Sequence, residues 1–214
     1  MKKIWFIRHG ESASNAGEVT NDPHSTPLTA AGQRQAEIVA QTFTEPPELI
    51  VTSPYVRTHQ TAAPLRERFP EAAHEEWQVE ELGYITPEKY AGTTGKERVP
   101  WIYAFMTNTD PDFVDGEGAE SFNDMLNRVA VMREKLLESE AQSIAVFTHG
   151  AYLRIFLWQW LLGSPRAAEH KGNFGPFLMS VSVPNSCIIE GRLDEGNLFL
   201  GQISVDHLPQ DLQT

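Results

Sequence analysis

The residues best suited to chemistry near the start of the chain are a neighbouring histidine and arginine, His9 and Arg8, directly after the apolar run 4–7. A short apolar run that ends in turn-forming residues predicts a buried strand, and open α/β sheets place ligand sites at the carboxyl ends of their strands. Histidine offers a nucleophilic nitrogen near neutral pH, and the arginine guanidinium is a planar fork of donors that matches phosphate oxygens. This pair therefore suggests a site at which phosphate is transferred to histidine.

A second histidine has the same setting in the sequence. His149 directly follows the apolar run 144–147, so the two histidines could face one bound group from the tips of two parallel strands. Between them, a short strand at 49–51 and a turn are followed by Arg57, in the first turn of a predicted helix. The free amides at the start of a helix also attract anions. These residues predict a local positive site for phosphate.

The elements that must hold these residues alternate between strand and helix. Helices are predicted over 30–43 with Thr29 as the cap, from the turn at 52–54 toward Phe69, over 120–140 and over 152–162, and an antiparallel pair of strands is predicted within 177–206. The apolar positions of the first helix fall on one face, as do those of the third: Ala36, Val39, Ala40 and Phe43, then Phe122, Met125, Leu126, Val129, Met132, Leu136 and Leu137. This order predicts a three-layer α/β/α sandwich, a mostly parallel sheet flanked by helices, in one domain over 1–214.

Residues 71–119 differ in character from the rest of the chain. They are rich in Glu, Pro, Gly, Thr and aromatic residues, and their periodicity is weak. We expect them to form an insertion that lies over the carboxyl edge of the sheet. Within it, Lys96 and Arg98 are candidates for binding a second anionic group on a substrate.

Composition narrows the classes of partner. The chain has 17 basic and 29 acidic side chains, a net charge of −12, which would repel nucleic acid and anionic lipid. Cys187 is the only cysteine, so no intrachain disulfide can form and a reducing compartment is favoured; we expect this residue to be small core filling. No apolar run approaches the ~18 residues of a membrane span. We expect a soluble, cytoplasmic protein, with no nucleic-acid or membrane partner.

Five short motifs match, in order, those of a known family. They are Arg8-His9-Gly10-Glu11-Ser12 with Asn15; Pro27-Leu28-Thr29 with Gly32 and Gln35-Ala36; Ser53-Pro54 with Arg57 and Gln60-Thr61-Ala62; Glu120-Ser121; and His149-Gly150. Through these motifs, which span residues 4–155, the chain resembles the histidine phosphatase superfamily, the phosphoglycerate mutase-like group. The resemblance implies a two-step phosphoryl transfer through a phosphohistidine, without a metal ion or cofactor.

The resemblance also implies roles for particular residues. His9 would be the nucleophile, and Arg8, Arg57 and His149 would surround the transferring phosphoryl group. Substrate contacts would come from Asn15 and the loop after the first strand, for which we name Ser12, Gly10 and, after the second histidine, Gly150. Positioned cations stabilise the charge of the transition state, and two guanidinium groups would disfavour protonation of the nucleophilic ring.

A general acid must protonate the leaving oxygen. The family places a glutamate for this purpose in the insertion, and the stretch 79–84 occupies that position here. Its register favours Glu81, with Glu80 as the alternative. Arg154, on the apolar helix after His149, is expected to form a buried ion pair rather than a substrate contact.

Three functions remain open. The first is a phosphomonoester hydrolase acting on a small phosphorylated metabolite, and the second is a cofactor-dependent phosphoglycerate mutase. The third is a catalytically inactive phosphate-binding module, which would not need both a nucleophilic histidine and a nearby carboxylate. Mutases tend to carry a tryptophan-asparagine pair after the first motif and a more basic insertion, whereas this chain has Ser14-Asn15 and an acidic insertion. This difference favours the hydrolase. The physiological substrate and the oligomeric state stay open.

Overall fold

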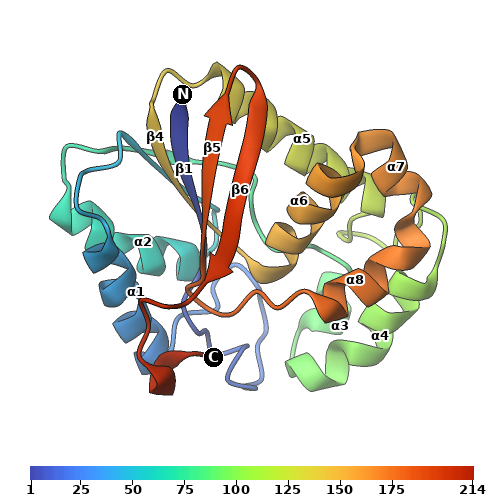
Figure 1. Ribbon diagram of the computed structural model, residues 1–214. Coiled ribbons are helices and arrows are strands. Elements are labelled where there is room, and N and C mark those ends of the chain that lie inside the picture. The colour runs from blue at the N-terminus through green and yellow to red at the C-terminus, as the bar shows by residue number, and fades with distance from the viewer.

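A six-stranded sheet lies at the centre of the computed structural model, which describes residues 1–214 (Figure 1). Its strands, in the spatial order β3-β2-β4-β1-β5-β6, have these bounds: β1 Lys2–Arg8, β2 Leu49–Thr52, β3 Ala73–Glu76, β4 Ser143–Thr148, β5 Ile188–Asp194 and β6 Asn197–Ser204. The first four strands are parallel to one another, and β5 and β6 are antiparallel to their neighbours. The prediction of a mostly parallel sheet is confirmed.

Helices cover both faces of this sheet. The eight α-helices are α1 Ala30–Thr42, α2 Val56–Arg68, α3 Pro87–Tyr90, α4 Gly95–Thr107, α5 Phe122–Glu138, α6 Gly150–Leu162, α7 Ser164–Glu169 and α8 Phe174–Ser180; two short 3₁₀ helices span 171–173 and 210–212. Figure 1 shows α1 and α2 on one side of the sheet and α5 to α8 on the other. Because alternate side chains of a strand point to opposite faces, Phe6 belongs to the core under α5 and α6, and Ile7 to the core under α1 and α2. The three-layer prediction is therefore confirmed.

Local signals account for where the main helices begin. The Thr29 hydroxyl accepts the Gly32 amide at 3.1 Å and caps α1, as predicted. Ser121 and Asp124 form a reciprocal capping box at the start of α5. The predicted buried face of α5 is confirmed except for Leu137, which is 47% exposed because it follows Leu136 around the helix toward solvent.

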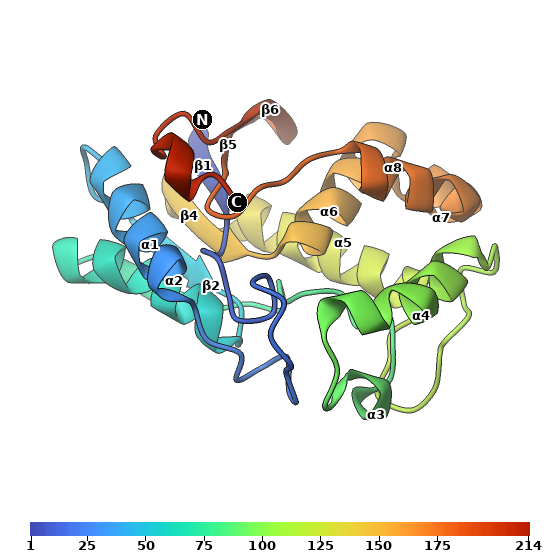
Figure 2. The ribbon, with the colours of Figure 1, turned by 90° about the horizontal axis from the view of Figure 1, so that it is seen from below.

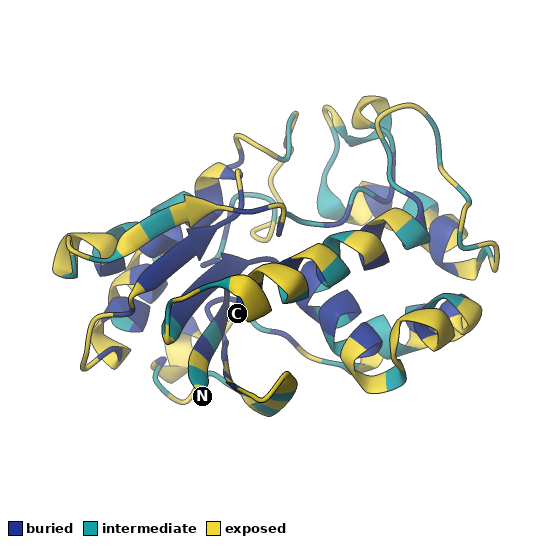
Figure 3. Cartoon of the chain, turned by 90° about the horizontal axis from the view of Figure 1, so that it is seen from above, coloured by how far each residue is buried: buried dark blue, intermediate teal, exposed yellow.

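Two parts of the chain differ from the prediction. Residues 73–76 (Ala-His-Glu-Glu) form the edge strand β3, although they lack an apolar pattern, because an edge strand needs only backbone pairing with β2. Residues 174–180 form helix α8, so the predicted strand pair does not begin at 177; β5 and β6 form an antiparallel pair over 188–204. Figure 3 shows the central strands mostly buried and the outward faces of the helices mostly exposed.

The carboxyl ends of the parallel strands meet the segment that follows β3. In Figure 1, β1 runs downward from the amino terminus, and α3 and α4 lie near its lower end. Figure 2 shows the loop after β1 on the same side of the molecule as α3 and α4. An isolated bridge between Thr20 and Thr93 joins this loop to the α3–α4 segment. None of the helices has both the length and the apolar character needed to cross a membrane.

Candidate active site

His9 lies directly after β1 and is almost fully buried, with 2% of its surface exposed. Its Nδ1 lies 2.6 Å from the Gly10 carbonyl oxygen, which can only accept, so Nδ1 carries the hydrogen and Nε2 has the free electron pair of a neutral ring. The Arg57 Nε donates to this Nε2 at 3.1 Å. Burial lowers the pKa of His9 well below its usual value, and the positive charges of Arg57 and Arg8 lower it further. The ring therefore presents an uncharged nucleophilic nitrogen.

Two arginines flank this ring. Arg57, in the first turn of α2, is 5% exposed, and its Nη1 donates to the Pro23 carbonyl at 2.6 Å. The Arg8 Nη1 donates to the Val183 carbonyl at 2.7 Å, whereas its buried Nε has no partner in the protein. Burial lowers the pKa of Arg8 to about 10, so the guanidinium keeps its charge at neutral pH.

His149 caps α6 from the end of β4 and is fully buried. Its ring centre is 5.0 Å from that of His9, and its Nε2 lies 2.7 Å from the Ser53 hydroxyl. Burial, followed by the charge of Arg57, lowers the pKa of His149 well below its usual value. Its Nδ1 is buried without a partner. Together with the Arg8 Nε, this atom is a buried polar group that the oxygens of a phosphate could satisfy.

The two glutamates of the 79–84 stretch have different surroundings. The Glu81 Oε1 accepts the amides of Ala151 and Tyr152, in the first turn of α6, at 3.0 and 3.1 Å. Glu81 also lines the same pocket as His9. The Glu80 carboxylate instead lies 3.7 Å from Arg128 and lines a separate pocket. Of the two candidates for the general acid, the structure brings only Glu81 to the histidines.

Gly10, in the loop after His9, is held by contacts with His9 and with the helices α1 and α2. The Gly10 amide donates to the Thr61 hydroxyl at 3.0 Å, and its carbonyl accepts from His9, so both of its backbone polar groups have partners. A Cβ at this position would lie 2.5 Å from the Gly32 carbonyl oxygen. Gly10 therefore allows the loop to pack closely on α1. Its amide is already bound to Thr61, so the predicted contact between this amide and a substrate is not supported.

The other predicted binding residues fall into two groups. Ser12 and Asn15 line the pocket, and the Ser12 hydroxyl donates to the Asn15 Oδ1 at 2.9 Å. Gly150 does not line it; a Cβ at this position would lie 3.0 Å from the Arg8 Nε, so this glycine makes room for the guanidinium. Its contribution is indirect, through the position of Arg8.

The contacts around the site differ from the sequence prediction at two residues, Arg154 and Asn185. Arg154 does not form the expected buried ion pair; its Nε donates to the Val181 carbonyl at 2.8 Å, and no carboxylate lies within ion-pair distance. Asn185, from the segment before β5, was not foreseen: its Nδ2 donates to the His9 carbonyl at 3.2 Å and to the Asn15 Oδ1 at 3.0 Å. No local signal marks Asn185, which is 176 residues from His9 in the chain. Cys187 is fully buried in the core, as predicted.

A pocket of about 360 Å³ joins His9, Arg57 and Glu81 to the segment between residues 82 and 102. Arg98 lines this pocket but is already bound by the protein: its Nε donates to the Thr93 hydroxyl at 2.9 Å, and its Nη2 donates to Thr20 Oγ1 at 2.6 Å and to the Tyr90 carbonyl at 3.1 Å. Lys96 is exposed and does not line the pocket. Of the two basic candidates, only Arg98 reaches the site.

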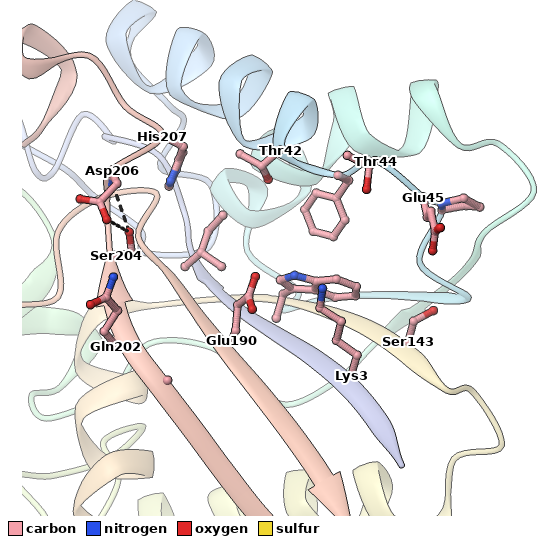
Figure 4. A pocket seen from close by; sticks show the side chains of 15 residues that line it. Lys3, Thr42, Thr44, Glu45, Ser143, Glu190, Gln202, Ser204, Asp206 and His207 are labelled. Carbon is pink, nitrogen blue, oxygen red and sulfur yellow. Dashed lines mark hydrogen bonds between the residues drawn. The ribbon is translucent and has the colours of Figure 1, made fainter.

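A larger cavity of about 680 Å³ lies elsewhere, between the end of α1 and strands β1, β5 and β6 (Figure 4). Its side chains include Lys3, Glu190, Asp206 and His207, and none of the predicted site residues. The chain contains no cluster of three or more His, Cys, Asp or Glu side chains arranged to hold a metal ion. Of the two cavities, only the pocket at His9 is lined by predicted catalytic residues: His9, Arg57 and Glu81 line it, whereas Arg8 and His149 do not.

Comparisons with known proteins agree with this geometry. Residues 4–183 match the family described as histidine phosphatase superfamily (branch 1). A curated relative from Yersinia enterocolitica, "Probable phosphoglycerate mutase GpmB", is 30% identical over 175 residues, which cover 80% of each chain.

Solved structures share the fold at lower sequence identity. A putative alpha-ribazole-5'-P phosphatase from Escherichia coli superposes with a TM-score of 0.73 at 21% identity, covering 94% of this chain and 95% of that one. Phosphoserine phosphatase from Entamoeba histolytica, in complex with 3-phosphoglyceric acid, has a TM-score of 0.73 at 21% identity, covering 98% of this chain and 100% of that one. With its family match over most of its length and its two histidines at neighbouring strand ends, this chain belongs to the histidine phosphatase superfamily.

Proposed function

We propose that this protein is a metal-independent phosphomonoester hydrolase that works through a phosphohistidine on His9, acting on a small phosphorylated substrate. One observation carries the proposal: the neutral Nε2 of His9 is oriented by Gly10 and Arg57 beside two buried nitrogens without protein partners, Arg8 Nε and His149 Nδ1. When the Ser53 hydroxyl donates to the His149 Nε2, the His149 Nδ1 carries the hydrogen of that ring. A tetrahedral phosphate has enough oxygens to accept from this Nδ1 and from the Arg8 Nε, and buried polar groups are normally satisfied.

In the first step the His9 Nε2 attacks phosphorus while the bond from phosphorus to the ester oxygen breaks. Negative charge spreads over the three equatorial oxygens in this transition state. Arg8, Arg57 and His149 stabilise that charge. Protein contacts hold Arg8, His149 and the Arg57 Nη1 in place, and the Arg57 Nε moves its hydrogen bond from the His9 Nε2 to a phosphate oxygen as this nitrogen attacks. Glu81 gives a proton to the leaving oxygen, so a neutral alcohol departs.

In the second step water attacks the phosphohistidine. Glu81, now a carboxylate, takes a proton from the water as the phosphorus–nitrogen bond breaks, and inorganic phosphate and free His9 result. The three amides of Leu82, Ala151 and Tyr152 that donate to Glu81 hold the carboxylate in one place for both proton transfers. One residue can therefore act as acid and then as base.

A phosphoglycerate mutase is the second candidate, and the name of the Yersinia relative favours it. Such an enzyme must hold a carboxylate-bearing intermediate long enough for the phosphoryl group to return to a neighbouring hydroxyl. Apart from Arg57, Arg98 is the one arginine or lysine that lines the pocket. Its Nε and Nη2 are bound to protein oxygens, and its Nη1 has only a 3.5 Å contact to the Ser14 hydroxyl. A second anion would therefore meet one cation with a single donor left for it, and this supports hydrolysis.

The proposal is tested by measuring hydrolysis of p-nitrophenyl phosphate with added EDTA, beside a mutase assay with and without bisphosphoglycerate. We expect hydrolysis that EDTA leaves unchanged and vanadate inhibits, and no more than weak mutase turnover. His9→Ala should abolish hydrolysis. Mutase turnover faster than hydrolysis would establish the second candidate, and phosphate binding without any turnover would indicate an inactive binding module.

A further inference from the structure

Beyond the phosphate-binding residues, one side of the pocket is lined by apolar side chains and the other by polar ones. Six side chains from the segment after Glu81 line the apolar side, and we call them the leaving-group wall: Leu82, Tyr84, Ile85, Pro87, Tyr90 and Ile102. Leu82, Tyr84 and Ile85 are between 5% and 8% exposed, so they are anchored in the core and show the pocket only a small part of their surface. A wall of this kind binds apolar groups by removing them from water.

The basic side chains near this wall have other partners. Arg98 uses its Nη2 and Nε on oxygens of Thr20, Tyr90 and Thr93, and its guanidinium stacks 3.5 Å from the centre of the Tyr90 ring. Lys89 pairs with Asp115 at 2.6 Å. Arg98 therefore keeps its positive charge in the pocket, but of its donors only Nη1, 3.5 Å from the Ser14 hydroxyl, is weakly bound.

A carboxylate lies in the same pocket. Asp22 accepts the amides of His24 and Ser25 at 3.0 and 3.2 Å, and no basic side chain lies within ion-pair distance of it. Partial burial raises the pKa of Asp22, but the hydrogen bonds from His24 and Ser25 outweigh it and bring the pKa below its usual value. The other charged or titratable groups around the pocket are His9, His24, Tyr55, Arg57, Glu81, Tyr84, Tyr90 and Arg98.

From these contacts we infer that the pocket selects phosphomonoesters whose leaving alcohol is uncharged and largely apolar, and that Asp22 disfavours leaving groups that carry a carboxylate. The inference rests on the proposed function, because it concerns the alcohol that the hydrolase releases. Arg8 and Arg57 attract the phosphate itself, so the selection acts only on the rest of the molecule. An apolar alcohol buries its surface against the wall. A carboxylate would lose water against these apolar side chains and would meet the Asp22 charge, while most of the donors of Arg98, the cation on this side of the pocket, are bound to protein oxygens.

Three phosphate esters of similar size test the inference: butyl phosphate, glycerol 3-phosphate and 3-phosphoglycerate. We expect kcat/KM to be highest for butyl phosphate and at least about tenfold lower for 3-phosphoglycerate, a difference that one unbalanced charge near a protein surface can produce. Asp22→Asn should raise kcat/KM for 3-phosphoglycerate by about five- to tenfold and leave butyl phosphate unchanged within about twofold. Asp194→Asn, which removes one exposed charge outside the pocket, is the matched control and should change neither.

Calorimetric titration of the same esters into His9→Ala measures the preference without turnover. If 3-phosphoglycerate is the best substrate or the tightest ligand, or if Asp22→Asn leaves the ratio between the esters unchanged, the inference is wrong even when hydrolysis is observed. If the wild-type protein hydrolyses none of the esters but His9→Ala still binds butyl phosphate more tightly, the proposed function fails and the selectivity of the pocket stands.

Discussion

Arg128 on α5 holds the segment that carries Glu81, and its replacement should affect both stability and catalysis. Its Nε and Nη2 donate to the Glu120 carboxylate at 2.6 and 2.8 Å, and its Nη1 donates to the Glu80 carbonyl at 2.9 Å. Glu120 in turn accepts the Gly83 amide at 2.8 Å. The backbone on both sides of Glu81 is therefore tied to this ion pair.

The expected cost follows from the burial of the pair. The Arg128 and Glu120 side chains are 11% and 26% exposed, so both charges are mostly removed from water. Removing one partner of a buried pair costs about 3–5 kcal/mol. Because Glu120 keeps the Gly83 amide and some solvent, we expect Arg128→Met to lower the free energy of unfolding by about 3 kcal/mol, the lower end of that range. Arg128→Lys keeps the charge but loses the bidentate hydrogen bonds to Glu120, so we expect the free energy of unfolding to fall by about 2 kcal/mol.

The catalytic effect should depend on the leaving group. Loosening the segment displaces Glu81, the proposed proton donor. The leaving oxygen of an alkyl phosphate needs this proton, whereas the leaving group of p-nitrophenyl phosphate departs as an anion. The alkyl phosphate should therefore lose at least about tenfold more kcat/KM than p-nitrophenyl phosphate. Urea denaturation gives the free energy of unfolding, and steady-state kinetics on the two esters give the ratio. Arg133→Met, on the same helix and without an ion pair, is the control and should stay within about 0.5 kcal/mol of the wild type. An Arg128→Met protein with wild-type stability, or with equal losses on both esters, would refute this role for Arg128.

Three further changes have defined outcomes. Gly10→Ala should lower the free energy of unfolding by about 1–3 kcal/mol, because its Cβ would lie 2.5 Å from the Gly32 carbonyl oxygen, whereas Gly172→Ala, whose Cβ would be 3.5 Å from its nearest neighbour, should cost less; urea denaturation compares the two. Tyr84→Phe should keep or raise the melting temperature, because it removes a buried hydroxyl that has no hydrogen-bond partner; a clear loss in thermal denaturation would show that the hydroxyl has one. Because the pKa values of His9 and His149 are lowered in the folded protein, the unfolded chain binds more protons below about pH 6.5, so the free energy of unfolding should fall by at most about 2 kcal/mol per histidine between pH 7 and pH 5. Denaturation of His149→Asn at both pH values checks this, and a slope equal to that of the wild type would exclude a contribution from His149.

The sequence alone determined which strands carry the site and the edge of the sheet at which it forms. Apolar runs followed by turn residues marked β1, β2 and β4, and the parallel arrangement of these strands brings their carboxyl ends together. His9, Arg57 and His149 could therefore be expected at one edge, since each follows directly after a strand or begins the next helix. The buried faces of α1 and α5 could be expected for a similar reason, because burial repeats with the period of the helix.

Only the tertiary structure decided what depends on contacts between segments that are distant in sequence. Glu80 and Glu81 are the same residue type, and only their contacts distinguish them. The carboxylate of Glu81 accepts amides of α6, whereas that of Glu80 lies beside the guanidinium of Arg128. The sequence predicts that Arg98 could bind an anionic group of the substrate. In the structure, its Nε and Nη2 bind oxygens of the loop after β1 and of the α3–α4 segment. Local sequence patterns report which face of an element is buried, because burial follows the period of that element. They do not report the partner of a polar side chain, because that partner is set by how separate segments pack.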